Sequence, residues 1–158
     1  MKTVAEAFVQ VLGWLIAGAV LLLLLAAAVH RWRRYAVVRR FRARYGPAGK
    51  DLLIVLTESR HWQPYIERHW LPRWASRAVV LDRSKPWRRD DPAAELWASV
   101  KGFEEHTPLA VVVPPRGGVR VVRFYKAFRD YKHGKGARLR TAERALEAAL
   151  EESGRHGG

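Results

Sequence analysis

The chain has 158 residues, a formal net charge of +14 and an isoelectric point near 11.0, and it contains no cysteine. The missing thiols exclude disulfide bonds, thiolate nucleophiles and cysteine-ligated zinc sites. The excess of positive charge indicates a polyanionic neighbour, either nucleic acid or the anionic leaflet of a membrane.

An apolar stretch near the N-terminus predicts a membrane span. Residues 8–29 (FVQVLGWLIAGAVLLLLLAAAV) carry no charge, and a helix of that length rises about 33 Å, enough for the roughly 30 Å of bilayer hydrocarbon. The segment must be helical because lipid offers the backbone no hydrogen-bond partners. The run is longer than the core of a cleaved signal peptide. We therefore predict an uncleaved transmembrane anchor over residues 1–30.

A basic connector over residues 31–50 follows, with seven arginines and no acid. The positive-inside rule places the N-terminus outside and the soluble domain in the cytoplasm. The sequence thus predicts a single-pass protein of a bacterial-type inner (plasma) membrane whose arginines meet anionic headgroups. These membrane-proximal arginines are Arg31, Arg33, Arg34, Arg39, Arg40, Arg42 and Arg44.

Two interpretations apply to residues 35–45, where Val37, Val38 and Phe41 are interspersed among arginines. The segment either extends the helix along the membrane surface with its apolar side toward lipid, or it is only the basic flank of the span. Residues 46–49 (GPAG) then end the helix. A domain over residues 51–152 and a flexible tail over residues 153–158 are expected beyond this break.

The first half of the domain alternates strand and helix. Residues 52–57 (LLIVLT) and 78–81 (AVVL) are short apolar runs typical of buried strands. A helical pattern lies between them, over residues 61–74. A second helix is expected over residues 93–105, capped by Asp90 or Asp91, with an apolar stripe made of Leu96, Val100 and Phe103.

The second half reads as a hairpin and a helix. Residues 109–113 (LAVVV) and 119–124 (VRVVRF) flank a Gly-Gly turn, which predicts an antiparallel pair. After a loop, a helix is expected over residues 141–152, with Thr141 as its N-cap. Its predicted buried side consists of Ala145, Leu146, Ala149 and Leu150.

This α/β order, β-α-β-α-β-β-α, resembles the thioredoxin fold over residues 51–152, because Thr107-Pro108 precedes the hairpin as a cis-proline does in that family. The resemblance implies a groove beside Pro108 that binds an extended peptide or a thiol cofactor. Redox members carry Cys-x-x-Cys where this chain has His61-Trp62-Gln63-Pro64, so thiol–disulfide exchange is not expected. The predicted binding groove consists of His61, Trp62, Tyr65, Thr107 and Pro108.

An enzymatic alternative uses Glu58, Ser59 and His61, with His106 brought near by the thioredoxin-like arrangement. Adjacent loop residues rarely form a nucleophile–base pair, and no nucleophile-elbow glycines surround Ser59. The eight-residue spacing of His61 and His69 differs from that of helical zinc ligands. We therefore predict no catalytic residue, no metal and no cofactor.

Residues 124–135 (FYKAFRDYKHGK) alternate aromatic and cationic side chains. Such a stretch can bind nucleic acid, an acidic partner or headgroups, or it can bury Phe124 and Phe128 and leave Lys126, Arg129 and Lys132 in solvent. The leading hypothesis is a non-catalytic adaptor or membrane-complex subunit, with anionic lipid and a protein as its partners. A membrane-tethered enzyme and a membrane-bound nucleic-acid-binding protein are the alternatives.

Overall fold

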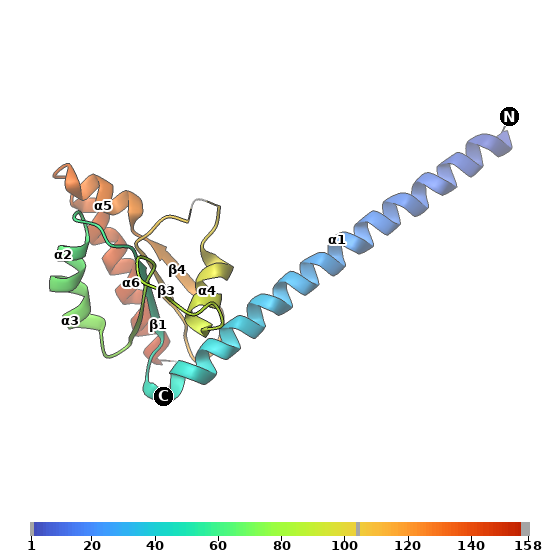
Figure 1. The fold of residues 1–158 in the computed structure, drawn as a ribbon. Helices are drawn as coiled ribbons and strands as arrows, with labels where there is room; N and C mark the ends of the chain where they lie inside the picture. Colours follow the sequence, from blue (N-terminus) through green and yellow to red (C-terminus); the bar gives the residue numbers. More distant parts are fainter. Residues whose placement is uncertain (1, 104, 156–158) are drawn as a thin grey trace. The chain divides into compact units, whose positions relative to one another are not determined.

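The computed structural model describes residues 2–103 and 105–155, and the chain divides into two compact units (Figure 1). Unit 1 is Met1–Ala36 and unit 2 is Val37–Gly158. The architecture is mixed α/β: one long N-terminal helix and a domain built on a four-stranded sheet. These features confirm the predicted α/β class and the predicted N-terminal helix.

Helix α1 (Lys2–Tyr45) is a single helix of 44 residues. Among the described residues it is the one helix that is long and apolar enough to cross a membrane. It continues through the predicted basic connector and ends where the 3-10 helix η1 (Gly46–Ala48) begins. Gly49 then adopts a φ of 71°, a conformation that favours glycine and allows the chain to turn into the sheet.

The sheet has the order β2-β1-β3-β4. β1 (Leu52–Leu56) pairs in parallel with β2 (Ala78–Asp82) and antiparallel with β3 (Leu109–Val112), which forms the predicted hairpin with β4 (Arg120–Arg123). Every residue of β1 is buried, as its continuous apolar run predicts. β2 is an edge strand whose Val80 side chain is exposed, so the prediction of a second fully buried strand is wrong.

The predicted first helix of the domain consists of three consecutive pieces, α2 (Gln63–Tyr65), the π-helix η2 (Ile66–Trp70) and α3 (Leu71–Trp74). Pro64 lies in the first turn, where its missing N–H costs no hydrogen bond. Pro72 does not end the helix, which continues for two more residues beyond it, to Trp74.

Helix α4 (Pro92–Val100) has the predicted Asp91 cap, whose carboxylate accepts a hydrogen bond from the Ala93 N–H at 2.7 Å. The helix ends before Gly102, which has a φ of 71°. Phe103 therefore lies outside the helix, and its side chain is 106% exposed. The predicted apolar stripe is wrong at this residue, because the left-handed glycine turns the chain away from the core.

Helix α5 (Tyr125–Lys132) occupies a stretch that the sequence predicts as a loop, although Phe124 and Phe128 are buried as one interpretation of that stretch required. Helix α6 (Ala137–Arg155) begins earlier than predicted, so Thr141 lies inside it and is not its N-cap. Ala145 is exposed and not part of the buried side. The helix also includes the first residues of the predicted tail, whereas residues 156–158 lie outside the described chain.

Helices cover both faces of the sheet. One face packs against the 63–74 helical segment, α5 and α6, with Trp70 among its largest fully buried side chains. The other face packs against α4 and the last turns of α1, where Phe41 is 0% exposed. The interpretation of residues 35–45 as a lipid-facing surface helix is therefore wrong for Phe41. Val37 and Val38 pack against the same core cluster.

Candidate functional site

The predicted binding groove begins at the end of β1. The Trp62 indole donates a hydrogen bond to the Thr57 carbonyl at 3.0 Å, and the Thr57 hydroxyl lies 2.9 Å from the Thr107 hydroxyl. Thr107 and Pro108 are buried, and the peptide bond between them is cis. Thr57 thus links Trp62 to the residue that precedes Pro108. Of Trp62, Thr107 and Pro108, only Trp62 is accessible to a ligand.

Tyr65 is directed to a different partner. Its hydroxyl donates to the Glu143 carboxylate at 2.9 Å, and the Trp70 indole donates to the same oxygen at 2.8 Å. Burial, followed by the hydrogen bond to Glu143, raises the pKa of Tyr65 to about 12. Its ring packs edge-on against Phe128, with centroids 5.5 Å apart. Tyr65 therefore joins the 63–74 helical segment to α5 and α6.

His61, the remaining predicted groove residue, is exposed and lies beside α5. Its Nε2 atom is 3.4 Å from the Lys132 ammonium. Its backbone N–H donates to the Ser59 hydroxyl at 3.3 Å. A histidine this close to a lysine lies in a cationic part of the surface.

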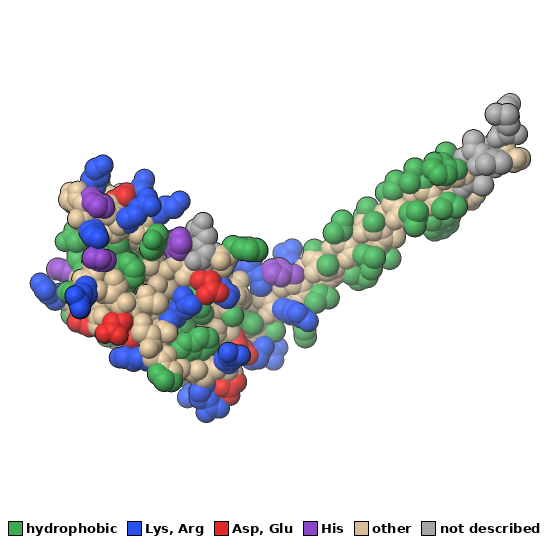
Figure 2. All heavy atoms as spheres, turned by 45° about the horizontal axis from the view of Figure 1, so that its top comes forward, with side chains coloured by type: hydrophobic (Ala, Val, Ile, Leu, Met, Phe, Trp, Pro, Cys, Tyr) green, Lys and Arg blue, Asp and Glu red, His purple; other side chains and the backbone are tan. Residues whose placement is uncertain are grey.

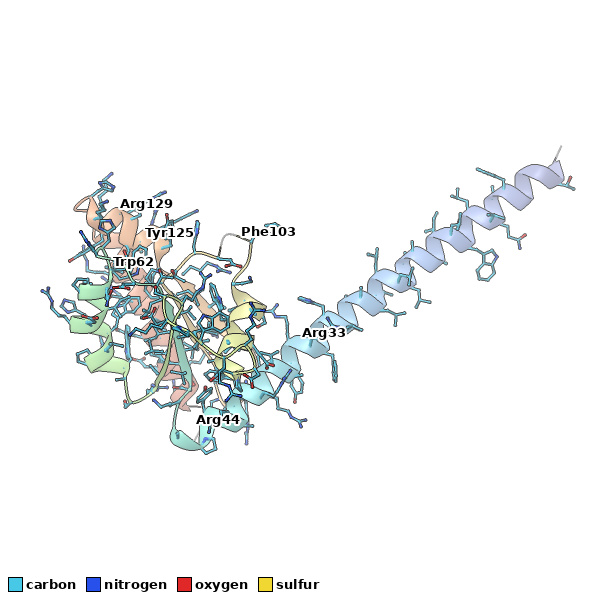
Figure 3. The ribbon with its side chains drawn as sticks, viewed as in Figure 1. Arg33, Arg44, Trp62, Phe103, Tyr125 and Arg129 are labelled. Atoms are coloured by element: carbon cyan, nitrogen blue, oxygen red, sulfur yellow. The ribbon has the colours of Figure 1, made fainter. Side chains whose placement is uncertain are left out.

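Three half-buried rings form what we call the aromatic row: Trp62, Tyr125 and His106. Trp62 meets Tyr125 edge-on with centroids 6.4 Å apart, and His106 lies 4.1 Å from Tyr125 with an interplanar angle of 33°. Figure 3 shows Tyr125 at the start of α5. The sequence prediction missed Tyr125, although the alternation of aromatic residues in that stretch was the available signal.

A cavity of about 350 Å³ adjoins the aromatic row. The Arg123 guanidinium donates to the Val100 carbonyl at 3.1 Å, which holds it beside the end of α4. Lys101 pairs with Glu105, and this hydrogen bond, together with Arg83, lowers the pKa of the Glu105 carboxyl. Rings and cations thus share one hollow, which suits a ligand with apolar and anionic parts. The lining includes Lys101, Phe103, His106, Arg123, Tyr125 and Lys126.

The residues of the enzymatic alternative are held by different neighbours. The Glu58 backbone N–H donates to the Ser84 hydroxyl at 2.6 Å, His61 lies beside Lys132, and the His106 ring stacks on Tyr125. Over residues 2–103 and 105–155, no three His, Asp or Glu side chains are grouped to hold a metal ion. These contacts supply neither a nucleophile–base pair nor a ligand set.

The predicted membrane-proximal arginines divide into three sets. Arg40 pairs with Glu95 at 2.8 Å, and Arg42 donates to the Pro114 and Gly117 carbonyls, both at 2.7 Å. These two side chains hold the last turns of α1 on the domain. The arginines of unit 1 are exposed on α1 and are placed within eight residues of the apolar run; they are Arg31, Arg33 and Arg34. Arg39 and Arg44 are also exposed, and Arg44 lies over the Tyr45 ring.

Comparisons of this chain with protein families, with curated proteins and with solved structures find no match. The chemistry of the site is therefore inferred from its own residues. These residues form the aromatic row and the neighbouring cavity, whose lining includes three cations.

Proposed function

We propose that the protein is a non-catalytic, single-pass protein of a bacterial-type inner membrane. Its N-terminus lies outside, and its thioredoxin-like domain binds a partner protein or peptide in the cytoplasm as an adaptor or membrane-complex subunit. The 22 uncharged residues of α1 and the exposed arginines that follow them support the anchor and its orientation.

The thioredoxin-like part of the proposal is supported by the sheet. The order β2-β1-β3-β4, with a parallel first pair and a closing hairpin, is the arrangement that the resemblance implies. Pro108 directly precedes β3, and helices lie on both faces of the sheet. The absence of cysteine from the whole sequence leaves recognition, and not thiol exchange, as the use of the site.

The aromatic row is the observation that carries the binding proposal. Aromatic side chains are enriched at protein interfaces because they bury a large area with little loss of conformational freedom. The Trp62 indole N–H already has an acceptor in Thr57, so a partner can cover this ring without leaving a polar group unsatisfied. The row lies beside Thr107 and Pro108, where the resemblance implies a peptide groove.

Photo-cross-linking in intact cells tests this role. A photoreactive phenylalanine analogue replaces Trp62 or Tyr125 in the full-length protein, and the matched control replaces Trp87, an exposed ring of the β2–α4 loop. We expect the same discrete adduct from positions 62 and 125 and none from position 87. Adducts of equal yield at all three positions, or none at positions 62 and 125, would contradict the proposal.

A separate experiment tests the orientation of the chain across the membrane and uses the absence of cysteine from the sequence. A single cysteine is introduced at Thr3 or at Lys135, both exposed, and cells are treated with a membrane-impermeant maleimide. We expect the Thr3→Cys protein to react in intact cells and the Lys135→Cys protein to react only after permeabilisation. The reverse pattern would place the domain on the outer side.

A further inference from the structure

The last turns of α1 run antiparallel to α4. The Tyr45 hydroxyl donates to Asp91 at the start of α4 at 2.8 Å, and Arg40 pairs with Glu95 one turn further along α4. From Tyr45 back to Val37, the chain therefore runs toward the end of the domain where α4 stops.

Phe103 is unusual for a soluble surface. Its ring is fully exposed at the tip of the α4–β3 loop, and it follows Gly102, whose left-handed conformation turns the chain outward (Figure 3). Transfer of such a ring from water to an apolar medium changes the equilibrium constant by about tenfold to about a hundredfold. An exposed phenylalanine beside a cationic hollow is typical of a surface that meets lipid, where a ring enters the interfacial zone and cations stay at the headgroups.

Helix α5 extends the positive charge of this end. Its acid, Asp130, is paired with Arg138 at 2.6 Å, so it does not offset the cations on the exposed side. Figure 2 shows Lys and Arg side chains over this part of the domain as well as along its other edges. The exposed cations of α5 and the loop after it are Lys126, Arg129, Lys132 and Lys135.

We propose that Phe103, Lys126 and Arg129 form a membrane-docking surface for anionic phospholipids of the leaflet that α1 enters. Phe103 inserts at the level of the headgroups, and the cavity beside it accepts a lipid phosphate near Lys126 and Arg123. This inference rests on the anchor in the proposed function. Seven residues lie between Val29 and Val37, which are therefore at most about 28 Å apart, so the bilayer is always within reach of the domain.

This proximity favours lipid over nucleic acid as the occupant. Both carry phosphates, and rings can stack on bases. A tethered domain, however, meets headgroups at a high effective concentration, whereas a nucleic acid must reach it from solution. Transfer of the exposed Phe103 ring from water to a lipid interface is also favourable in free energy.

The test uses the full chain reconstituted in vesicles of phosphatidylcholine, with or without phosphatidylglycerol. A fluorophore is placed on a single cysteine at His133 beside α5 or, as the matched control, at Trp87 near the start of α4; both positions are exposed. Lipids spin-labelled near the headgroup quench a fluorophore that touches the membrane. We expect quenching at position 133 only in anionic vesicles, with its loss at high salt, and none at position 87.

Substitutions then test which side chains hold the domain on the membrane. Lys126→Glu/Arg129→Glu should lower the docked-to-free ratio by at least roughly twentyfold, since each cation near an anionic surface contributes roughly fivefold. Phe103→Ala should lower it roughly tenfold. The matched control Lys85→Glu/Arg89→Glu changes two exposed cations of the β2–α4 loop and should leave the quenching unchanged. Circular dichroism confirms that each variant is folded.

Several results would overturn the docking proposal: quenching at position 133 that ignores lipid charge, equal quenching at position 87, or no effect of the charge-reversal pair. Single-stranded DNA that binds the reconstituted protein and displaces the quenching would assign the surface to nucleic acid. Release of the protein from vesicles by carbonate would instead contradict the anchor. Retention of the protein without quenching at position 133 would contradict the docking surface alone.

Discussion

Two apolar runs of the chain have nearly the same composition and opposite surroundings. Residues 21–25 (LLLLL) of α1 are 54–70% exposed, whereas β1 (LLIVL) is 0–9% exposed. The first run lies within 22 uncharged residues and makes its hydrogen bonds inside its own helix. The second is five residues long and makes them to β2 and β3. The length of an apolar run, and not its composition, decides whether lipid or protein covers it.

The largest effect is expected from substitutions that keep the apolar run of α1 out of lipid. Leu22→Arg/Leu23→Arg places two charges near the centre of α1, at a cost of roughly 3 kcal/mol each for insertion. We expect the carbonate-resistant membrane fraction to fall by more than about a hundredfold. Leu22→Ile/Leu23→Ile is the control and should insert normally. A charged variant that stays in the membrane would contradict the comparison, because insertion would then not depend on an uncharged run.

Two phenylalanines of α1 test where the helix passes from the exposed span to the buried core of the domain. Phe41→Ala removes a side chain that is 0% exposed and should lower the free energy of unfolding of the domain by about 3–5 kcal/mol. Phe8→Ala removes one that is 69% exposed and should change it by less than about 0.5 kcal/mol. Urea unfolding in detergent, followed by near-UV circular dichroism, measures both. Equal losses would mean that the span and the domain are not separate units.

Polar contacts should contribute less than the apolar core. Asp51 accepts from the Arg77 guanidinium at 2.9 Å and from the Ser153 hydroxyl at 2.6 Å, which ties the start of β1 to α6. Asp51→Ala should lower the unfolding free energy by about 1–3 kcal/mol because both donors lose their acceptor. Asp90→Ala, which breaks an exposed pair with Arg88, should leave the unfolding free energy nearly unchanged. An Asp51→Ala variant with unchanged stability would show that these side-chain contacts do not stabilise the start of β1.

The smallest expected effect concerns Tyr65. Its pKa is raised from 10.0 to about 12, so the unfolded chain releases this proton first, and the stabilisation is complete below pH 10 and lost as the pH rises toward 12. Tyr65→Phe should cost about 1 kcal/mol at neutral pH. It should also reduce the decline of the unfolding free energy between pH 10 and 12. Glu143→Gln should reduce that decline by a smaller amount, because the burial of Tyr65, the largest cause of its raised pKa, remains. An unchanged profile in both variants would contradict the assignment.

Long runs and local signals could be predicted from the sequence. The apolar run of α1, the buried strand β1, the hairpin and the Asp91 cap each depend on a few consecutive residues. The apolar spacing predicts Phe103 on a helix, although Gly102 is of a residue type that commonly follows a helix end and is a visible stop signal. Helix α5 has eight residues and buries only Ala127 and Phe128, too short a periodic pattern to distinguish from a loop.

The candidate site could be predicted only in part, because its contacts join residues that are distant in the sequence. Trp62 and Thr107 were placed together through the resemblance, and the hydrogen bonds through Thr57 connect them. The contacts of Tyr125 with Trp62 and with His106 depend on where α5 packs. The surroundings of Phe41 depend likewise on strands that are distant in the sequence.

The burial of Phe41 has a consequence for synthesis. Translation produces residues 37–45 well before the strands and helix that cover them, and the last residue of that core cluster, Val121, is made about eighty residues after Phe41. Until then Val37, Val38 and Phe41 have no complete protein surface to pack against. We expect the nascent chain to complete its globular part only after the ribosome has passed the hairpin. Stalled nascent chains shorter than that should remain protease-sensitive even when their first helix is already inserted.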